Sequence, residues 1–419
     1  MKTRIKLLIY FTIIAVLLLQ VIIQKYIGFV KYIDEIIALG ATIYTAYALF
    51  RKRAEKKIVY SLIIMFIIFV VGLISNFMFS VETRIPAIIT DMATLFKGYI
   101  SFFGFYLLFD NMEETEKNTV IKYLARLCTV IIIPGFILLF VNLFVNINMH
   151  TDYVYGLRAF HYIFLRVGNL KTFCVRSLII FTLALINNKK REKEITAYII
   201  MSLVLMVSTL RARAFIIAFL YIIGYIFFIV LKKNKFKLRY TLPTVIPLLI
   251  IAAPKIQYYF ANTKRARYVL LKYGFETAKK YFPLGAGFAT YGTYAASTYK
   301  SILYKKYNFN KYHGLSDNFG AFLTDNYWPA IMGEFGIIGV ILFCALIINI
   351  IRMIFEATKD KLHQRFIALF GIVTMIIEST VSSSFSDSHA VFTMLLIAVA
   401  ITYKGGVTNE NINRTTNAK

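Results

Sequence analysis

Two arginines interrupt an otherwise apolar stretch of the chain and point to binding of an anion. Arg211 and Arg213 lie in Ser208-Thr-Leu-Arg-Ala-Arg213, and the flanking residues from Ile195 to Leu231 are mainly apolar. A single helix over this stretch would be about 55 Å long, whereas the hydrocarbon core of a bilayer is roughly 30 Å thick. The stretch is therefore predicted to form a hairpin with both arginines at its turn. There they either extend toward lipid headgroups or bind a fixed anion through their planar donors.

A long polar segment from Pro254 to Trp328, here called the island, is the second candidate for chemistry. It carries eleven lysines and arginines, among them Arg265 and Arg267, against three acidic residues. Loops of this length are usually functional. We therefore expect the island to handle an anionic substrate.

Within and just after the island, a histidine and two carboxylates have the types needed for proton transfer. His313 precedes Asp317 by four residues, and Glu334 stands just inside the next apolar run. A histidine held by a carboxylate is a general base near neutral pH, although His313 is equally consistent with an ordinary loop residue. Gly285 and Gly287 are placed where the backbone must turn or approach a ligand closely.

A second loop, from His150 to Thr172, mixes basic and aromatic residues. Arg158, His161, Arg166 and Lys171 stand among tyrosines and phenylalanines. This mixture suits recognition of a phosphate beside a sugar ring, and a solvated loop without a role is equally consistent with it.

The elements that position these residues are predicted to be membrane-spanning helices. Hydrophobic residues make up 59% of the 419 residues and charged residues 16%, which excludes a soluble domain. A span requires about 20 predominantly apolar residues. Twelve runs satisfy this approximately: Leu7–Ile23, Ile33–Phe50, Ile58–Asn76, Ile85–Phe109, Cys128–Met149, Phe173–Ile186, Ile195–Leu210, Ala214–Leu231, Tyr240–Ala253, Pro329–Ile351, Phe366–Val381 and Ala390–Tyr403. We therefore predict an all-α polytopic membrane protein with about 12 transmembrane helices.

The distribution of basic residues predicts the orientation of these spans. Lysines and arginines cluster before the first run and after the second, sixth and eighth runs. Basic short loops stay in the cytoplasm, whereas long loops cross largely regardless of charge. Residues 1–253 are then expected to hold nine spans, 254–328 to be a long external loop, 329–403 to hold three spans, and 404–419 to form a cytoplasmic tail. The net charge of +27 partly reflects this topology and does not imply nucleic-acid binding.

Other ionisable residues admit more than one interpretation. Asp91 and Lys97 lie six residues apart inside the fourth run and are predicted either to line a cavity or to pair with other helices. No spacing of histidines or cysteines supports a zinc site, and the chain contains no Asp-x-Asp motif. We therefore expect no metal and no cofactor.

The order of these features resembles the bacterial O-antigen polymerase and ligase superfamily, in particular the Wzy-type polysaccharide polymerases. The similar features are the arginine-bearing hairpin, the long basic loop, Pro283-Leu-Gly-Ala-Gly287, His313-Gly-Leu-Ser-Asp-Asn318 and Glu334-Phe-Gly-Ile-Ile-Gly339. They extend from about Ser208 to Gly339, and Asp34-Glu35 and Arg166-Val-Gly-Asn are similar but less specific.

The resemblance implies a GT-C-like glycosyltransferase of the bacterial inner or cytoplasmic membrane, with both termini cytoplasmic. It would transfer an undecaprenyl-diphosphate-linked glycan onto a lipid-linked repeat unit at the outer face, and a chain-length regulator is a further candidate partner. Carried onto this chain, the diphosphate-binding residues would be Arg211 or Arg213, Arg265 or Arg267, and Arg166. His313, with Asp317 or Glu334, would lie at the reaction centre. The substrate loop would include Gly285, Gly287, Asn318 and Tyr327.

Two other functions fit parts of the same pattern. A ligase that moves finished glycan to a surface acceptor also has a histidine in its long loop. A flippase of lipid-linked oligosaccharides would predict internal repeats with broken helices, and no repeat is visible in the twelve runs.

Overall fold

The computed structural model describes residues 2–51, 55–146, 153–154, 156–164, 166–232, 253, 257, 263–316 and 318–405. The long helices are α1 (Lys2–Ile23), α2 (Ile33–Phe50), α3 (Lys56–Phe79), α4 (Ile85–Asp110), α5 (Glu114–Phe144), α6 (Val167–Asn187), α7 (Glu192–Val207), α8 (Ala212–Gly224), which continues as the π-helix η3 (Tyr225–Val230), α13 (Tyr327–Ala357), α14 (Leu362–Ser379) and α15 (Ser388–Thr402). Short 3-10 helices, η1 (Gly28–Tyr32) and η2 (Lys189–Arg191), precede α2 and α7. A two-residue hairpin pairs β1 (Tyr153–Val154) with β2 (Leu157–Arg158).

These helices confirm the class of fold. Every predicted run overlaps a helix except Tyr240–Ala253, which lies outside the described residues apart from its last residue. Within the described part, eight helices are long and apolar enough to cross a membrane, and α15 and the apolar part of α1 are shorter. The protein is therefore an all-α, multi-pass membrane protein.

One helix starts well before its predicted run. The run beginning at Cys128 is part of α5, which starts at Glu114. The first turns of α5 contain charged residues, and Lys117 among them finds hydrogen-bond acceptors within the protein. Its Nζ donates to Glu114 at 2.8 Å and to the Thr402 carbonyl at 3.0 Å. Hydropathy alone does not detect a helical segment stabilised in this way.

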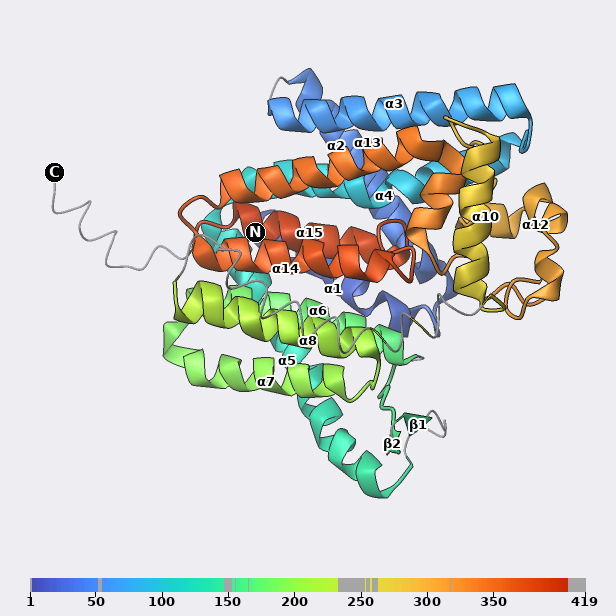
Figure 1. Cartoon of the computed structure of the whole chain (residues 1–419). Helices are drawn as coiled ribbons and strands as arrows, with labels where there is room; N and C mark the ends of the chain where they lie inside the picture. Colours follow the sequence, from blue (N-terminus) through green and yellow to red (C-terminus); the bar gives the residue numbers. More distant parts are fainter. Residues whose placement is uncertain are drawn as a thin grey trace.

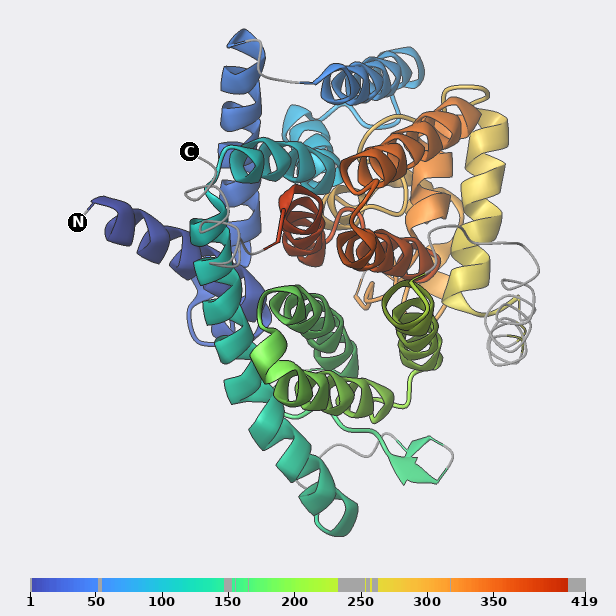
Figure 2. The same cartoon turned by 90° about the vertical axis from the view of Figure 1, so that its left-hand side faces the viewer.

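The helices form one bundle around α4 and α15. Figures 1 and 2 show α3, α13, α14 and α15 running in roughly one direction, with the island gathered at one end of the bundle. Helix α15 is buried from Ala390 to Thr402, and it packs against α4, α14 and α6. A mainly apolar helix that is buried all round has no face left for lipid, which accounts for its weak amphipathic pattern.

The described part of the island is folded and contains several helices. It contains α10 (Ala266–Lys280), α11 (Tyr294–Thr298), α12 (Ile302–Lys306) and η5 (Phe309–Lys311). A second apolar core, separate from that of the bundle, includes Val269, Leu270, Tyr291, Leu303 and Phe309. Its helix α10 crosses the N-terminal part of α13 (Figure 1). The island is therefore a small domain docked on the end of the bundle.

Docking depends on a break in α13. Gly336 has φ 59° and ψ −156°, so the helix is interrupted there. The carbonyls of Gly333 and Glu334 accept from the amides of Ala286 and Gly287 at 2.9 and 2.8 Å. A Cβ on Gly285 would lie 2.4 Å from the Gly336 nitrogen. Glycine at both positions is therefore required for the island turn to approach α13 this closely.

Candidate substrate-binding site

The predicted hairpin is confirmed, and its second arginine points into a cluster of charges. Helix α7 ends at Val207 and α8 begins at Ala212. Arg213 forms an ion pair with Glu378 at the end of α14, and Lys171 of α6 pairs with the other oxygen of the same carboxylate. A guanidinium and an ammonium thus share one buried anion.

These three side chains border a polar cavity of about 190 Å³. Its lining also contains Asn169, Thr172, Ser382, Ser384, Asp387, His389 and Thr393. Hydroxyls, amides and charges therefore surround a space between α6, α8, α14 and α15 that would otherwise be filled by apolar packing. Buried polar linings of this kind, with a few convergent charges, are typical of ligand sites.

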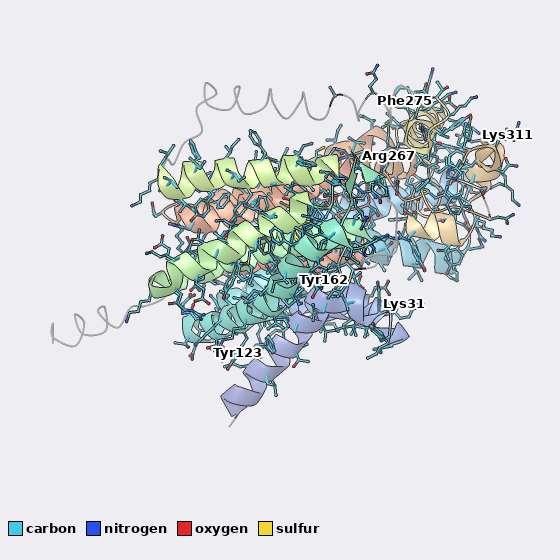
Figure 3. All side chains as sticks on the ribbon, turned by 90° about the horizontal axis from the view of Figure 1, so that it is seen from below. Lys31, Tyr123, Tyr162, Arg267, Phe275 and Lys311 are labelled. Carbon is cyan, nitrogen blue, oxygen red and sulfur yellow. The ribbon has the colours of Figure 1, made fainter. Side chains whose placement is uncertain are left out.

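The island and the second loop bring two further arginines to the same region. Arg267 Nη2 lies 3.3 Å from Asp325 Oδ2, with the two side chains 14% and 28% exposed. Burial raises the pKa of Asp325, and the positive charges of Arg267, Arg213 and Arg166 oppose this shift. Three of the predicted diphosphate-binding arginines therefore lower the pKa of the same carboxyl group, that of Asp325, although they come from three separate segments. Figure 3 shows Arg267 nearer the bundle than Lys311, which lies at the edge of the island.

The start of α15 adds an acid and a histidine, which lie beside an arginine of α6. Asp387 caps the helix by accepting from the amides of His389 and Ala390 at 2.9 and 3.0 Å. Arg176 Nη2 lies 3.2 Å from His389 Nδ1 and 3.0 Å from its carbonyl. Burial raises the pKa of Asp387 to about 6, against the effect of Lys97 and Arg176. This carboxyl therefore changes charge near neutral pH.

The charges of this group, here called the site cluster, do not cancel. It consists of Arg166, Lys171, Arg176, Arg213 and Arg267 with Asp325, Glu378 and Asp387. Five cations and three carboxylates leave a formal excess of two positive charges when all eight groups are ionised. Lys171 and Arg176 are buried, Arg213 and Arg267 are partly buried, and Arg166 is exposed. An excess of positive charge that is partly withdrawn from water is suited to binding a dianion.

The other two predicted arginines, Arg211 and Arg265, occupy exposed positions. Arg211 and Arg265 precede α8 and α10 as the residues flanking each helix start. Arg213 and Arg267 carry the ion pairs that join the site cluster. The structure therefore distinguishes Arg211 from Arg213 and Arg265 from Arg267. Spacing in the sequence offers no reason to prefer either member of each pair.

His313 lies outside the cavity lining formed by the described residues. It is exposed, and its ring contacts Phe319 and Phe322 at centroid distances of 5.3 and 6.1 Å. Asp317 lies outside the described residues, and Asn318 is exposed. The proposed pairing of His313 with Glu334 is not what the structure shows, because the Glu334 carboxyl is buried, bonds to the island turn and interacts with Asp91.

The substrate-loop residues predicted around the glycine turn are structural. Gly287 has φ 91°, and a Cβ there would meet Asn76 of α3 at 2.6 Å. Gly285 and Gly287 thus approach helices and not the cavity. Tyr327 is buried in α13, where its hydroxyl lies 3.0 Å from that of Tyr99. Placing Tyr327 in the substrate loop was wrong, because the last island residues already belong to the apolar start of α13.

The open question about Asp91 and Lys97 is resolved in favour of pairing with other helices. Lys97 Nζ lies 2.6 Å from Asp34 Oδ2 of α2, and Gln20 of α1 donates to Asp34 Oδ1 at 2.7 Å. Asp91 interacts with Glu334 of α13. Asp91 and Lys97 are therefore each paired with a segment distant in the sequence.

Sequence reasoning did not select Glu378, Asp387 or His389 as site residues. All three lie at or near the polar run Ser382-Ser-Ser-Phe-Ser-Asp-Ser-His389 between two apolar helices. That run was the available signal, because short connections between spans rarely need so many hydroxyls together with an acid and a histidine.

Comparison with known proteins does not identify the chain: no protein-family model matches it, and no curated protein matches it.

Proposed function

We propose that the protein is a Wzy-type polysaccharide polymerase that uses an undecaprenyl-diphosphate-linked glycan. The observation that carries this proposal is the convergence of Arg166, Arg213 and Arg267 with Lys171 beside a polar cavity, with two positive charges in excess. A diphosphate esterified at both ends carries two negative charges. Arginines bind such oxygens through bidentate, charge-assisted hydrogen bonds.

In the proposed reaction, a sugar hydroxyl of the acceptor attacks the anomeric carbon of the donor. The bond from that carbon to the diphosphate oxygen breaks, and the lipid diphosphate leaves with the bonding electrons. Negative charge grows on the leaving oxygens. Arg213, Arg267 and Lys171, which pair with carboxylates of the site cluster, are the cations that we expect to stabilise it. Preorganised cations stabilise such a transition state more than the ground state.

The proton of the attacking hydroxyl needs an acceptor, and the cavity offers Asp387. This carboxyl lines the cavity, and its pKa is raised to about 6 by burial. A base with a pKa near the working pH is effective. His313 remains the candidate from the family resemblance, and it would need to reach the cavity from its exposed place in the island.

If Asp387 is the base, the polymerisation rate should fall at acid pH. Protonation removes the base, so the rate is expected to decrease about tenfold for each pH unit below about 6. The folded-state pKa lies above the ordinary value of 3.8, so Asp387 favours folding at low pH and this contribution is lost as pH rises through about 6. A rate profile with Asp387→Asn as comparison checks this. An unchanged acid limb in that variant would assign the limb to another group.

We propose that the reaction is metal-independent, because the chain has no Asp-x-Asp motif and its donor is lipid-linked. Chelation with EDTA should leave the polymerisation rate within about twofold of the untreated value. Loss of activity on chelation, followed by recovery with a divalent cation, would contradict this prediction.

The proposal places the site cluster at the outer face of the bacterial cytoplasmic membrane, with both termini inside and twelve spans in a GT-C-like arrangement. The segment Tyr240–Ala253 would supply the ninth span. A deletion strain tests the function: loss of long chains with survival of single repeat units supports a polymerase. Loss of glycan on the surface acceptor with normal chain length would instead indicate a ligase, and accumulation of repeat units on the cytoplasmic face a flippase.

A further inference from the structure

Two carboxyl side chains face each other where the island meets the bundle. Asp91 of α4 and Glu334 of α13 are both completely buried. Their side chains interact with each other. They are not in the cavity lining, and the proposed reaction does not use them.

Each carboxyl also receives donors from the island turn. Asp91 Oδ2 accepts from the Ala289 amide at 2.7 Å. Glu334 Oε1 accepts from the amides of Thr290 and Tyr291 at 2.9 and 3.0 Å, and from the Thr293 hydroxyl at 3.0 Å. These bonds join the bundle to four residues of the turn: Ala289, Thr290, Tyr291 and Thr293.

The other two oxygens explain how the acids can lie together. Asp91 Oδ1 and Glu334 Oε2 are buried with no donor from any other described side chain or amide. An ionised carboxylate only accepts hydrogen bonds, so two facing carboxyls bond only if one carries a proton. Two ionised acids that interact at a completely buried position would also repel each other.

Among the described residues, no cation acts on the pair. From α12, Tyr304 faces the pair, and burial together with the pair's negative charge raises its pKa, so its hydroxyl stays neutral. In the connection between α3 and α4, Glu82 and Arg84 bond to each other at 2.5 Å. From α11, the nearby Thr293 is uncharged.

We propose that Asp91 and Glu334 share one proton and together act as a clamp that holds the island on the bundle. The clamp is a positioning device. It fixes the turn from Ala289 to Thr293, and through the island it places Arg267 and Asp325 at the site cluster. Only this last step rests on the proposed function.

A shared proton makes an unusual prediction for amide substitutions. In Glu334→Gln, the amide oxygen can accept from the turn while the NH₂ group donates to Asp91, replacing the shared proton. Asp91→Asn is equivalent with the roles reversed. In the double variant Asp91→Asn/Glu334→Gln, both oxygens are needed by the turn, so two NH₂ groups face each other and neither finds an acceptor. Each single variant should therefore hold the island, and the double variant should release it.

The experiment uses the full chain in lipid nanodiscs and measures the rate of trypsin cleavage within the island, with the thermal unfolding midpoint as a second readout. Each single variant is expected to be cleaved within about twofold of the wild-type rate. The double variant is expected to be cleaved roughly tenfold faster, since an unsatisfied buried donor costs about 1–3 kcal/mol. Glu356→Gln, at the exposed end of the same helix α13, is the matched control and should behave as wild type.

The proposal would be overturned if the effects on the cleavage rate were additive, so that the double variant was no worse than its two single variants combined. It would also be overturned if either single variant released the island. If the double variant does not fold, pH provides the test. Raising the pH should remove the shared proton and speed cleavage of the wild type, whereas Glu334→Gln should show little change. A wild type as insensitive as Glu334→Gln would overturn the proposal. Cleavage does not depend on glycan chemistry, so its failure is distinguishable from failure of the proposed function.

Discussion

Replacing Arg213 with alanine is expected to reduce polymerisation by about 10²- to 10³-fold, the typical cost of removing one preorganised group that stabilises transition-state charge. Arg213 reaches into the cavity and shares Glu378 with Lys171. Because Lys171 would still neutralise Glu378 in this variant, the fold should survive. Initial rates with a lipid-diphosphate-linked repeat unit, at matched protein levels, give the comparison.

Arg211 is the matched control for this prediction. It lies two residues away at the same turn and is exposed, so Arg211→Ala should reduce the rate less than about tenfold. Equal losses in the two variants would show that the turn as a whole, and not the Arg213 contact, supports activity. A larger loss in Arg211→Ala would contradict the assignment.

The second large effect is expected at Arg267. Arg267→Ala should also reduce the rate by about 10²-fold or more, whereas Arg265→Ala should reduce it by less than about tenfold. Removing Arg267 also leaves Asp325 partly buried without its ion-pair partner, which lowers stability. The measurement is therefore the rate per folded protein, with the unfolding midpoint recorded for each variant.

A double variant separates the two consequences of losing Arg267. Arg267→Ala/Asp325→Asn removes the orphaned charge, so the unfolding midpoint should recover toward the wild-type value while polymerisation remains low. Recovery of activity together with stability would mean that Arg267 serves only to neutralise Asp325, and it would remove Arg267 from the proposed diphosphate site.

Much of the fold follows from hydropathy, because a helix in lipid must be apolar along a length set by the bilayer. The hairpin at Ser208–Arg213 was predictable for that reason and is confirmed. The start of α5 at Glu114 was not predictable, because Lys117 in its first turns donates to the Thr402 carbonyl, 285 residues away. A pairing across such a sequence distance leaves no local pattern.

The candidate site was predictable only in part, because it also depends on pairing between residues far apart in the sequence. Arginine in an apolar turn is conspicuous, so Arg213 could be selected from the sequence. Its partner Glu378 lies 165 residues away and reads as an ordinary helix end. The glycine turn was conspicuous too, but its closest neighbours are backbone atoms of α13 and side-chain atoms of α3. Glycine spacing indicates close approach without indicating to what.

The account is tested most directly by reconstitution of the purified protein in a bilayer with an undecaprenyl-diphosphate-linked repeat unit as the only glycan. The wild type should produce a ladder of longer lipid-linked chains and release lipid diphosphate. Arg213→Ala should produce neither, while Arg211→Ala retains both. Absence of a ladder from folded wild-type protein, or an undiminished ladder from Arg213→Ala, would contradict the proposal that the site cluster binds the lipid diphosphate during polymerisation.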